Sequence, residues 1–197
     1  ANIKTQSTQG LEGGVDLRMF YNRLRINATA YSQTSTDLVL PVQVSAASGV
    51  YFVWDNVGEL RNNGIELQLG STVVKKKDLN IDIDLNLAKN NNQVITVGND
   101  PDPDVEETLI IGSTWNMELQ VREGHPYGAI VGTSLERDPD GNVVYENGLP
   151  VVGDKIVLGN IQPDFTGGIN LGVRYKNVVF TTLVDGKMGG EVYTMTN

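Results

Sequence analysis

The sequence contains no cysteine, a single histidine and no long run of apolar residues. Without cysteine, disulfide frameworks, thiolate metal sites and cysteine nucleophiles are all excluded. A membrane-spanning helix needs roughly 20 apolar residues in succession, and no segment approaches that length. A helical membrane protein is therefore excluded, whereas a membrane protein of another kind is not.

Basic residues are also scarce. The chain has 15 Lys and Arg against 24 Asp and Glu, which gives a formal charge of −9. Such a surface repels phosphate backbones, so nucleic acid is not expected as a partner. The 197 residues, of which 40% are hydrophobic, are typical of a folded domain and exclude overall disorder. No charged and apolar leader is found at Ala1, so any export signal is expected to have been removed or to lie outside this sequence.

What the sequence has in abundance is alternation with period two. In residues 79–87, Leu and Ile alternate with Asn and Asp. Since successive side chains of a strand point to opposite faces, this segment predicts a strand with one apolar and one polar face. The same pattern marks residues 15–19, 24–31, 65–69 and 169–174. No segment shows helical periodicity with caps, so the sequence predicts an all-β fold.

The connections between these strands are of two kinds. Residues 20–23, 75–78 and 175–177 have the length and composition of hairpin turns. Residues 38–59 and 97–166 are long connections. Because short and long connections alternate, an antiparallel up-and-down meander places all the turns at one end and all the long loops at the other. This layout is typical of an outer-membrane β-barrel.

The connection lengths predict three regions. They are residues 1–97 with barrel strands and one long extracellular loop (about 38–59), residues 98–165 as a large extracellular loop region with short hairpins, and residues 166–197 as a barrel strand pair. The large loop opens on the acidic stretch 99–104, whose prolines exclude it from a central strand. Residues 138–142 have the composition of a tight turn.

Charged residues lie inside the predicted strands and are interpreted as lumen-facing. They are Asp16, Arg18, Glu66, Asp82, Asp84 and Arg174. A soluble β-sandwich also has polar outer faces, so periodicity alone leaves that alternative open. A watery lumen accounts better for charges deep in strands, and a sandwich has no reason to segregate its connections by length. Asp82 and Asp84 could form a glycosidase pair, but neighbours on one strand face meet that spacing trivially, and lumen lining is the stronger interpretation.

Several motifs occur along the chain in a recognisable order. Residues 20–24 read FYNRL, and residues 56–67 read NVGELRNNGIEL, the most specific of the motifs. Further motifs occupy residues 90–94, 124–128 and 163–168. Together they cover nearly the whole chain, and in this order they resemble the SusC/RagA-type TonB-dependent outer-membrane transporters.

The resemblance implies a barrel of about 22 strands with an N-terminal plug in the outer membrane. Such a protein imports glycans or peptides with energy from TonB, and a SusD-type surface lipoprotein covers the barrel as a lid. This sequence matches a late part of the barrel with roughly six strands, fewer than the eight or so of the smallest barrels. As an isolated piece it could pack its apolar faces on each other as a sandwich or an oligomer. The alternative function is a soluble all-β binding or adhesion module of the carbohydrate-binding type.

Aromatic residues in the long connections are the candidate substrate-binding groups. Tyr51, Trp54, Trp115 and Tyr127 offer flat rings that can stack on sugar faces, or else pack the interior of the loops. A second set lies beside the short turns, where a membrane girdle of aromatic residues is expected: Phe20, Tyr21, Tyr175 and Phe180.

No catalytic residue, metal site or cofactor is predicted, and an enzyme is not expected. His125 lies in a GHPYG segment that is expected to form a turn, and the chain has no G-x-S-x-G motif. Asp100, Asp102 and Asp104 could offer oxygens to calcium, but the prolines between them and the missing glycine depart from the EF-hand pattern. A solvated acidic loop is the better interpretation there, and a plain turn is the better one for residues 138–142.

Overall fold

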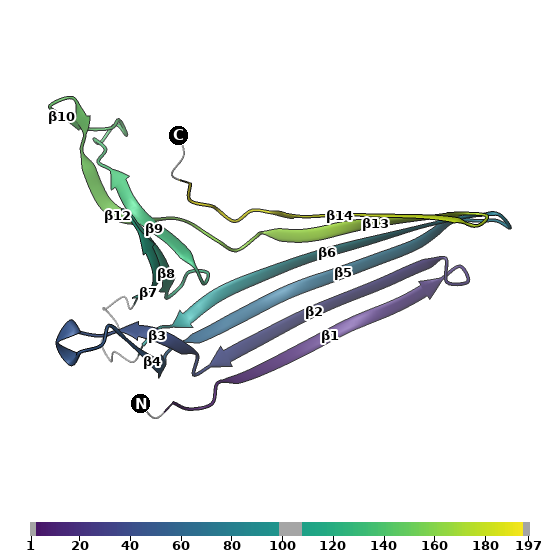
Figure 1. Cartoon of the computed structure of the whole chain (residues 1–197), viewed down its shortest axis with the longest axis horizontal. Coiled ribbons are helices and arrows are strands. Elements are labelled where there is room, and N and C mark those ends of the chain that lie inside the picture. The colour runs from purple at the N-terminus through teal and green to yellow at the C-terminus, as the bar shows by residue number, and fades with distance from the viewer. Residues whose placement is uncertain (1–2, 99–107, 195–197) are drawn as a thin grey trace.

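The structure, a computed structural model, describes residues 3–98 and 108–194. Six long strands form one antiparallel sheet in the order β1-β2-β5-β6-β13-β14, as Figure 1 shows. Their bounds are β1 Ser7–Met19, β2 Leu24–Thr36, β5 Glu59–Lys75, β6 Leu79–Thr96, β13 Phe165–Tyr175 and β14 Val178–Met188. The predicted all-β antiparallel meander is therefore confirmed. Across the described ranges, no helix is long and apolar enough to cross a membrane.

The strand register gathers the apolar side chains on one face of this sheet. One row crosses all six strands: Leu17, Ile26, Leu69, Leu85, Ile169 and Val184. A shift of one residue would send an entire strand's apolar set to the opposite face, so the alternation in the sequence determines the register. The face has no covering layer in the described part of the chain: Leu17 is 48% exposed and Val184 is 64% exposed. The sheet is open and does not fold back on itself as a sandwich.

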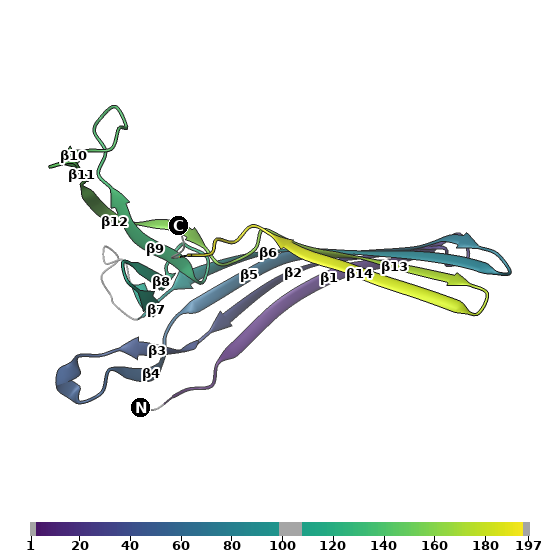
Figure 2. The same cartoon turned by 45° about the horizontal axis from the view of Figure 1, so that its top comes forward.

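Short turns and long connections lie at opposite ends of the sheet (Figures 1 and 2). The β1–β2, β5–β6 and β13–β14 turns gather at one end, which we call the turn end. Two of the turns are tied together, because the Lys176 N–H donates to the Asp78 carbonyl at 2.8 Å. The β1–β2 turn runs through three successive left-handed residues, with φ between 54° and 64° at Phe20, Tyr21 and Asn22.

The opposite end, the loop end, carries three smaller β structures (Figure 2). The first is a hairpin of β3 (Val39–Gln43) and β4 (Phe52–Asn56), joined through the short 3₁₀ helix Ala46–Ser48. The second is a four-stranded sheet in the order β12-β9-β8-β7, with bounds β7 Thr108–Thr114, β8 Met117–Arg122, β9 Ala129–Leu135 and β12 Val152–Asn160. The third is a two-residue ladder between β10 (Tyr145–Glu146) and β11 (Leu149–Pro150).

A small hydrophobic core joins the loop end to the main sheet. It consists of Val57, Val94, Val97, Leu109 and Val121, with Leu40, Val42, Leu60, Ile111 and Tyr127 packed against it. Backbone hydrogen bonds reinforce the junction, since the Val94 N–H donates to the His125 carbonyl at 2.9 Å and the Gly124 N–H donates to the Val94 carbonyl at 3.0 Å. The core therefore fixes the loop-end elements to the start of β5 and the end of β6, while the long strands extend away from it.

Candidate polar surface of the sheet

The six charged residues predicted to face a lumen all lie on one face of the main sheet. Register establishes this, because β6 positions 80, 82, 84 and 86 align with even positions on β13, and positions 82, 84 and 86 align with even positions on β5. A register shift between Thr72 and Val74 pairs position 80 with Lys75 on β5. The same rows continue through β2 to positions 16 and 18 of β1. Asp16, Arg18, Glu66, Asp82, Asp84 and Arg174 thus share the face opposite the apolar rows, which we call the polar face.

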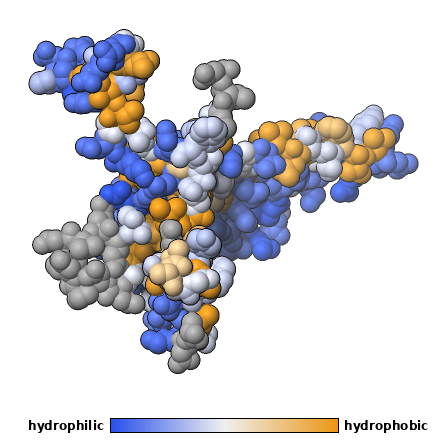
Figure 3. All heavy atoms as spheres, turned by 60° about the vertical axis from the view of Figure 1, so that its left-hand side comes forward, coloured by the Kyte–Doolittle hydropathy of each residue, from blue (hydrophilic) through white to orange (hydrophobic). Residues whose placement is uncertain are grey.

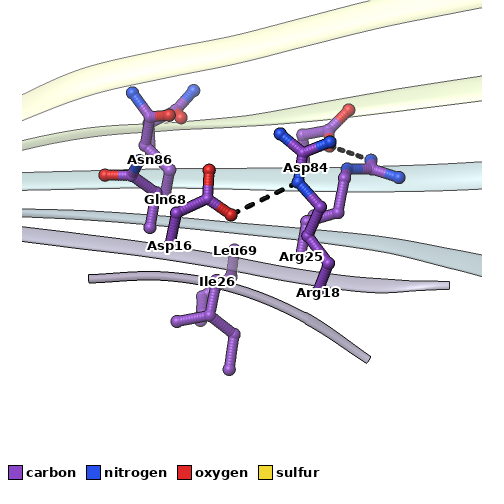
Figure 4. Close-up of a pocket in the computed structure, with 10 residues that line it drawn as sticks. Asp16, Arg18, Arg25, Ile26, Gln68, Leu69, Asp84 and Asn86 are labelled. Atoms are coloured by element: carbon purple, nitrogen blue, oxygen red, sulfur yellow. Dashed lines mark hydrogen bonds and ion pairs between the residues drawn. The ribbon is translucent and has the colours of Figure 1, made fainter. Parts of the chain in front are cut away.

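An ion pair spans two strand gaps on this face. The Arg25 guanidinium on β2 donates from Nη2 to Oδ1 of Asp84 on β6 at 2.8 Å, and it passes over Gly70 on the intervening β5 (Figure 4). A Cβ at position 70 would lie 2.6 Å from that carboxylate oxygen and 2.7 Å from Nη2, so the bridge requires glycine there. Both side chains are about 40% exposed, which leaves them available to solutes.

Arg25 also lies directly opposite Arg18 in the β1–β2 register. Like charges facing each other across a strand pair are destabilising. Each guanidinium, however, binds a different carboxylate, since Arg18 donates to Asp16 at 3.3 Å while Arg25 binds Asp84 (Figure 4). The two pairs separate the repelling cations and hold four charges in a fixed pattern.

The two ion pairs line a polar cavity of about 310 Å³. Its remaining walls come from Ile26, Asn27, Gln68, Leu69, Gly70 and Asn86. Amides and paired charges can both donate and accept hydrogen bonds, so the cavity suits polar solutes such as hydroxyl or amide groups. Among its lining residues there is no nucleophile next to a base.

A second bridge over glycine lies closer to the loop end. Tyr31 on β2 crosses Gly64 on β5, and its hydroxyl is 3.3 Å from Oδ1 of Asn90 on β6. Asn62 Oδ1 accepts hydrogen bonds from the side-chain amides of Asn90 at 3.0 Å and Asn92 at 2.7 Å. These residues border a second cavity of about 370 Å³, lined by Glu12, Thr29, Tyr31, Gln33, Asn62, Glu66 and Asn90. The polar face is therefore a continuous hydrogen-bonding surface.

Sequence reasoning identified six charged members of this surface, including Arg18 and Arg174, but missed Arg25, Tyr31 and the amide residues. Arg25 and Tyr31 lie within the alternating segment 24–31, so their face was predictable. Their hydrogen-bonding partners were not predictable, because both side chains cross β5 to bind residues on β6. Only glycine at positions 64 and 70 of β5 leaves room for the crossing side chains.

The four predicted aromatic residues occupy different elements of the loop end. Tyr51 and Trp54 belong to the β3–β4 hairpin and are 71% and 58% exposed. Trp115 is 84% exposed in the β7–β8 turn, where its φ of +48° is a conformation that a bulky side chain rarely adopts. Tyr127 instead packs against the hydrophobic core, with its N–H donating to Asn92 Oδ1 at 2.7 Å. Three of the four rings are thus presented to solvent.

Residues 138–142 form the predicted turn, and the Asp138 carboxylate accepts hydrogen bonds within it. Asp138 accepts hydrogen bonds from the N–H groups of Asn142 at 2.8 Å and Asp140 at 3.0 Å. These bonds, that of Asn142 foremost, hold the pKa of Asp138 below its usual value. The aspartates at 100, 102 and 104 lie outside the described residues. Within residues 3–98 and 108–194, no cluster of three or more His, Asp or Glu side chains is placed to hold a metal ion.

An ion pair also stabilises the loop-end sheet. Lys155 on β12 donates to Oε1 of Glu118 on β8, and Gln120 donates to Oε2 of the same carboxylate at 2.7 Å. The Lys155 bond is the main cause, and the Gln120 bond the second, of a lowered pKa at Glu118. This carboxylate therefore connects β8 to β12 across the intervening β9.

Comparison with known proteins gives consistent similarities along the chain. A family model described as TonB dependent receptor-like, beta-barrel, matches residues 1–194. The chain is 28% identical to TonB-dependent receptor P3 of Formosa agariphila over 99% of its length, and 23% identical to TonB-dependent receptor SusC of Bacteroides thetaiotaomicron over 98%. It superimposes on a structure of the RagAB peptide transporter with a TM-score of 0.73, at 21% identity over 91% of the chain. The chain spans about a fifth of the length of these relatives, covering 22%, 20% and 21% of them. These similarities confirm the resemblance that the sequence motifs indicate.

Proposed function

Because the chain belongs to the TonB-dependent receptor-like β-barrel family of the outer membrane, we propose that it forms part of the wall of an importer of glycans or peptides. Members of this family are transporters and not enzymes. In this proposal the polar face borders the lumen and acts by binding and passage of the solute, without chemistry. Asp16, Arg18, Glu66, Asp82, Asp84 and Arg174 are its charged lining.

The observation that carries the proposal is the division of one open sheet into two continuous faces. An uncovered row of six apolar side chains is costly in water but stable against lipid chains. The opposite face keeps ion pairs and amides hydrated. A soluble binding module would instead have to cover the apolar face with a second layer. A position in a barrel wall, with lipid on one side and water on the other, accounts for both the uncovered apolar face and the hydrated polar face.

Strand direction gives the orientation of the segment. In outer-membrane barrels, short turns face the periplasm and long loops face the outside. The turn end of the sheet accordingly lies at the periplasmic surface, and residues 38–59 and 98–165 are extracellular. Phe20, Tyr21, Tyr175 and Phe180, each more than half exposed, lie near the turn end at the level of an aromatic girdle.

The proposed partner on the outside is a SusD-type lipoprotein lid. Exposed apolar residues gather on the protruding tip of the loop end that carries β10 and β11 (Figure 3). They are Leu135, Tyr145, Leu149 and Val152, each at least 45% exposed. A patch of this kind on an otherwise polar loop region suits a protein contact. Contact with TonB would run through parts of the protein beyond this chain.

Solute binding at the loop end is proposed for the exposed rings of Tyr51, Trp54 and Trp115. Pro41 lies directly opposite Trp54 in the β3–β4 hairpin and provides a rigid neighbour for that ring. Trp115 is 84% exposed in the β7–β8 turn, so its ring is accessible to a solute from outside. The partly buried Tyr127 would support this region from within the core.

Uptake by the full-length receptor that carries this chain tests the proposal. Cells that express it should accumulate labelled oligosaccharide or peptide in a TonB-dependent manner. Trp54→Ala and Trp115→Ala should weaken ligand binding about fivefold or more each, since stacked rings contribute about 1 kcal/mol or more. Tyr21→Ala is the matched control, because Tyr21 is fully exposed at the opposite end of the sheet. Unchanged affinity in both tryptophan variants would assign these rings structural roles.

A further inference from the structure

The apolar face of the main sheet has a depression that the importer proposal leaves unused. Its volume is about 510 Å³, and it lies over β13, β14 and the adjoining part of β6. Gly167 on β13 and Gly186 on β14 are paired within it, in the same row as Leu87 on β6. Because two successive positions of this row have no side chain, we call the depression the glycine groove.

Apolar side chains of the same row and the two adjacent rows form the walls of the glycine groove. They are Leu85, Leu87, Phe165, Ile169, Val184 and Met188. Leu87 leans over the β13 side, since a Cβ at Gly167 would lie 2.8 Å from Leu87 Cδ2. The β14 side is open, because a Cβ at Gly186 would meet no atom of the described residues within 4 Å. The floor at Gly186 therefore leaves space for part of another molecule.

A cation lies at the border of the glycine groove that is nearer the loop end. Lys89 belongs to the apolar face by register, because it is paired with Ile65 on β5. Its ammonium lies 4.9 Å from the centroid of the Phe165 ring. Counted from the turn end, Lys89 is the first charged side chain on the apolar face of the six main strands. The next row pairs Asn63 with Asn91, so polar side chains replace apolar ones at this level.

The distance of Lys89 from the turn end matches the height of a membrane's apolar band. From Leu79 to Lys89, β6 rises about 34 Å along its own axis, at about 3.4 Å per residue. With a tilt of about 40°, which is usual for outer-membrane barrels, this rise is about 26 Å along the membrane normal. The apolar band of such barrels is about 25 Å tall. Since the loop end faces outside, Lys89 lies at the level of the head groups of the outer leaflet, and the glycine groove lies just below it.

We propose that the glycine groove binds an acyl chain of lipid A, the phosphorylated anchor of lipopolysaccharide, with a lipid A phosphate against the Lys89 ammonium. The inference rests on the proposed function, since it takes the apolar face to meet lipid and the loop end to face outside. Lipopolysaccharide forms the outer leaflet of an outer membrane, so it is the anionic lipid present at this depth. A chain lying over Gly186 makes the dispersion contacts that a bare glycine leaves unmade, and lysine binds phosphate as a point charge.

Native mass spectrometry of the full-length receptor in detergent, titrated with purified lipid A, measures the affinity. Gly186→Leu should weaken lipid A binding about fivefold, because the leucine fills the open floor of the groove. Gly13→Leu is the matched control and should leave the affinity unchanged, since Gly13 also has open space around it and lies on the apolar face of β1, outside the groove. A heat-modifiable band on gels verifies that each variant is folded, and Gly186→Val replaces Gly186→Leu if the leucine variant is not.

A second pair of variants tests the phosphate contact. Lys89→Gln should weaken lipid A binding about fivefold, but it should leave the affinity for lipid A without its phosphates unchanged. Lys4→Gln is the matched control, because it removes the same charge from an exposed site outside the groove. Equal losses with both lipids would overturn the phosphate contact, and an unchanged lipid A affinity of the Gly186 variant would overturn the groove.

Two further measurements separate the alternatives. Phosphatidylglycerol should compete poorly with lipid A, because lipid A presents more acyl chains to the apolar walls. Equal competition would reassign the groove to an ordinary phospholipid and overturn the lipid A assignment. Uptake is measured on the same proteins. A receptor that imports its solute without binding lipid A refutes this inference alone, and one that binds lipid A without import refutes the proposed function alone.

Discussion

The bridge of Tyr31 over Gly64 gives a prediction whose sign depends on a neighbouring residue. A Cβ built at position 64 would lie 2.2 Å from Cζ and 2.3 Å from Oη of Tyr31. Carbon atoms in contact are normally about 3.5–4.0 Å apart, so Gly64→Ala has to displace the ring. The displaced ring loses its hydrogen bond to Asn90 and its cover over β5.

The magnitude follows from two costs and one gain in the free energy of unfolding. Loss of the hydrogen bond costs about 0.5–1.5 kcal/mol. Exposure of part of the ring adds about 1 kcal/mol, a fraction of the 1.5–3 kcal/mol for burying a whole large side chain. Alanine in place of a strand glycine returns about 0.5–1 kcal/mol. Gly64→Ala alone is therefore expected to lower the free energy of unfolding by about 1 kcal/mol, whereas in a Tyr31→Ala background it should raise it by about 0.5–1 kcal/mol.

Guanidinium unfolding of the full-length receptor in detergent, followed by tryptophan fluorescence, measures the four proteins of this cycle. Gly13→Ala is the control, because the space around Gly13 is open within 4 Å and alanine meets no obstacle there. The reasoning is refuted if Gly64→Ala destabilises the receptor equally with and without the tyrosine ring. A coupling energy near zero would mean that the ring does not depend on the missing Cβ.

Three further predictions concern other parts of the chain. Ile83→Arg, near the middle of the apolar rows, should destabilise the membrane-inserted receptor by about 2–4 kcal/mol, measured by unfolding from lipid vesicles, while Asp84→Asn on the opposite face should cost about 1 kcal/mol or less. Asn92→Ala should cost about 1–3 kcal/mol, since the buried amide joins Asn62 to the backbone of Tyr127, and proteolysis of the loop end should accelerate. Because the pKa of Glu118 is lowered from 4.5, its ionised form stabilises the loop-end sheet above that pH, and this contribution is lost as the pH falls through the lower folded value. Hydrogen exchange of β8 should therefore rise more steeply as the pH falls in the wild type than in Glu118→Gln. Because Lys155 is half exposed, the ion pair contributes less than about 1 kcal/mol to the stability of the sheet. Equal pH profiles in the two proteins would contradict the role of the ion pair.

Alternation predicted the main sheet well, because in a strand with one apolar and one polar face the type of each residue shows which face its side chain occupies. The segment 79–87 determines its own register on both neighbours, and the charged residues it carries share the polar face with Asp16 and Arg174 as expected. The contrast of short and long connections likewise predicted which ends of the strands lie together.

The loop end was much less accessible to sequence reasoning. Its four-stranded sheet has the order β12-β9-β8-β7 and contains shifts of register, so no strict alternation marks its strands. The burial of Tyr127 depends on Val94 and Val121, which come from distant parts of the chain. Ring exposure at Trp54 and Trp115 is equally a property of the assembled loops, and local composition could not distinguish these rings from Tyr127.

The pairing of β6 with β13 has a consequence for the order of folding. The β1–β2, β5–β6 and β13–β14 pairs each close a turn of a few residues, but the β6–β13 pairing must bring Ala88 and Thr166 together across the whole loop region. Closing such a long loop costs conformational entropy before any contact forms, and pairings of high sequence separation form slowly. The core around Val94 and Val121 shortens that search, because it folds part of the intervening chain onto the end of β6. The loop end thus favours the pairing of β6 with β13 during folding. Substitutions that weaken its core should slow this pairing more than they change the stability of the folded sheet.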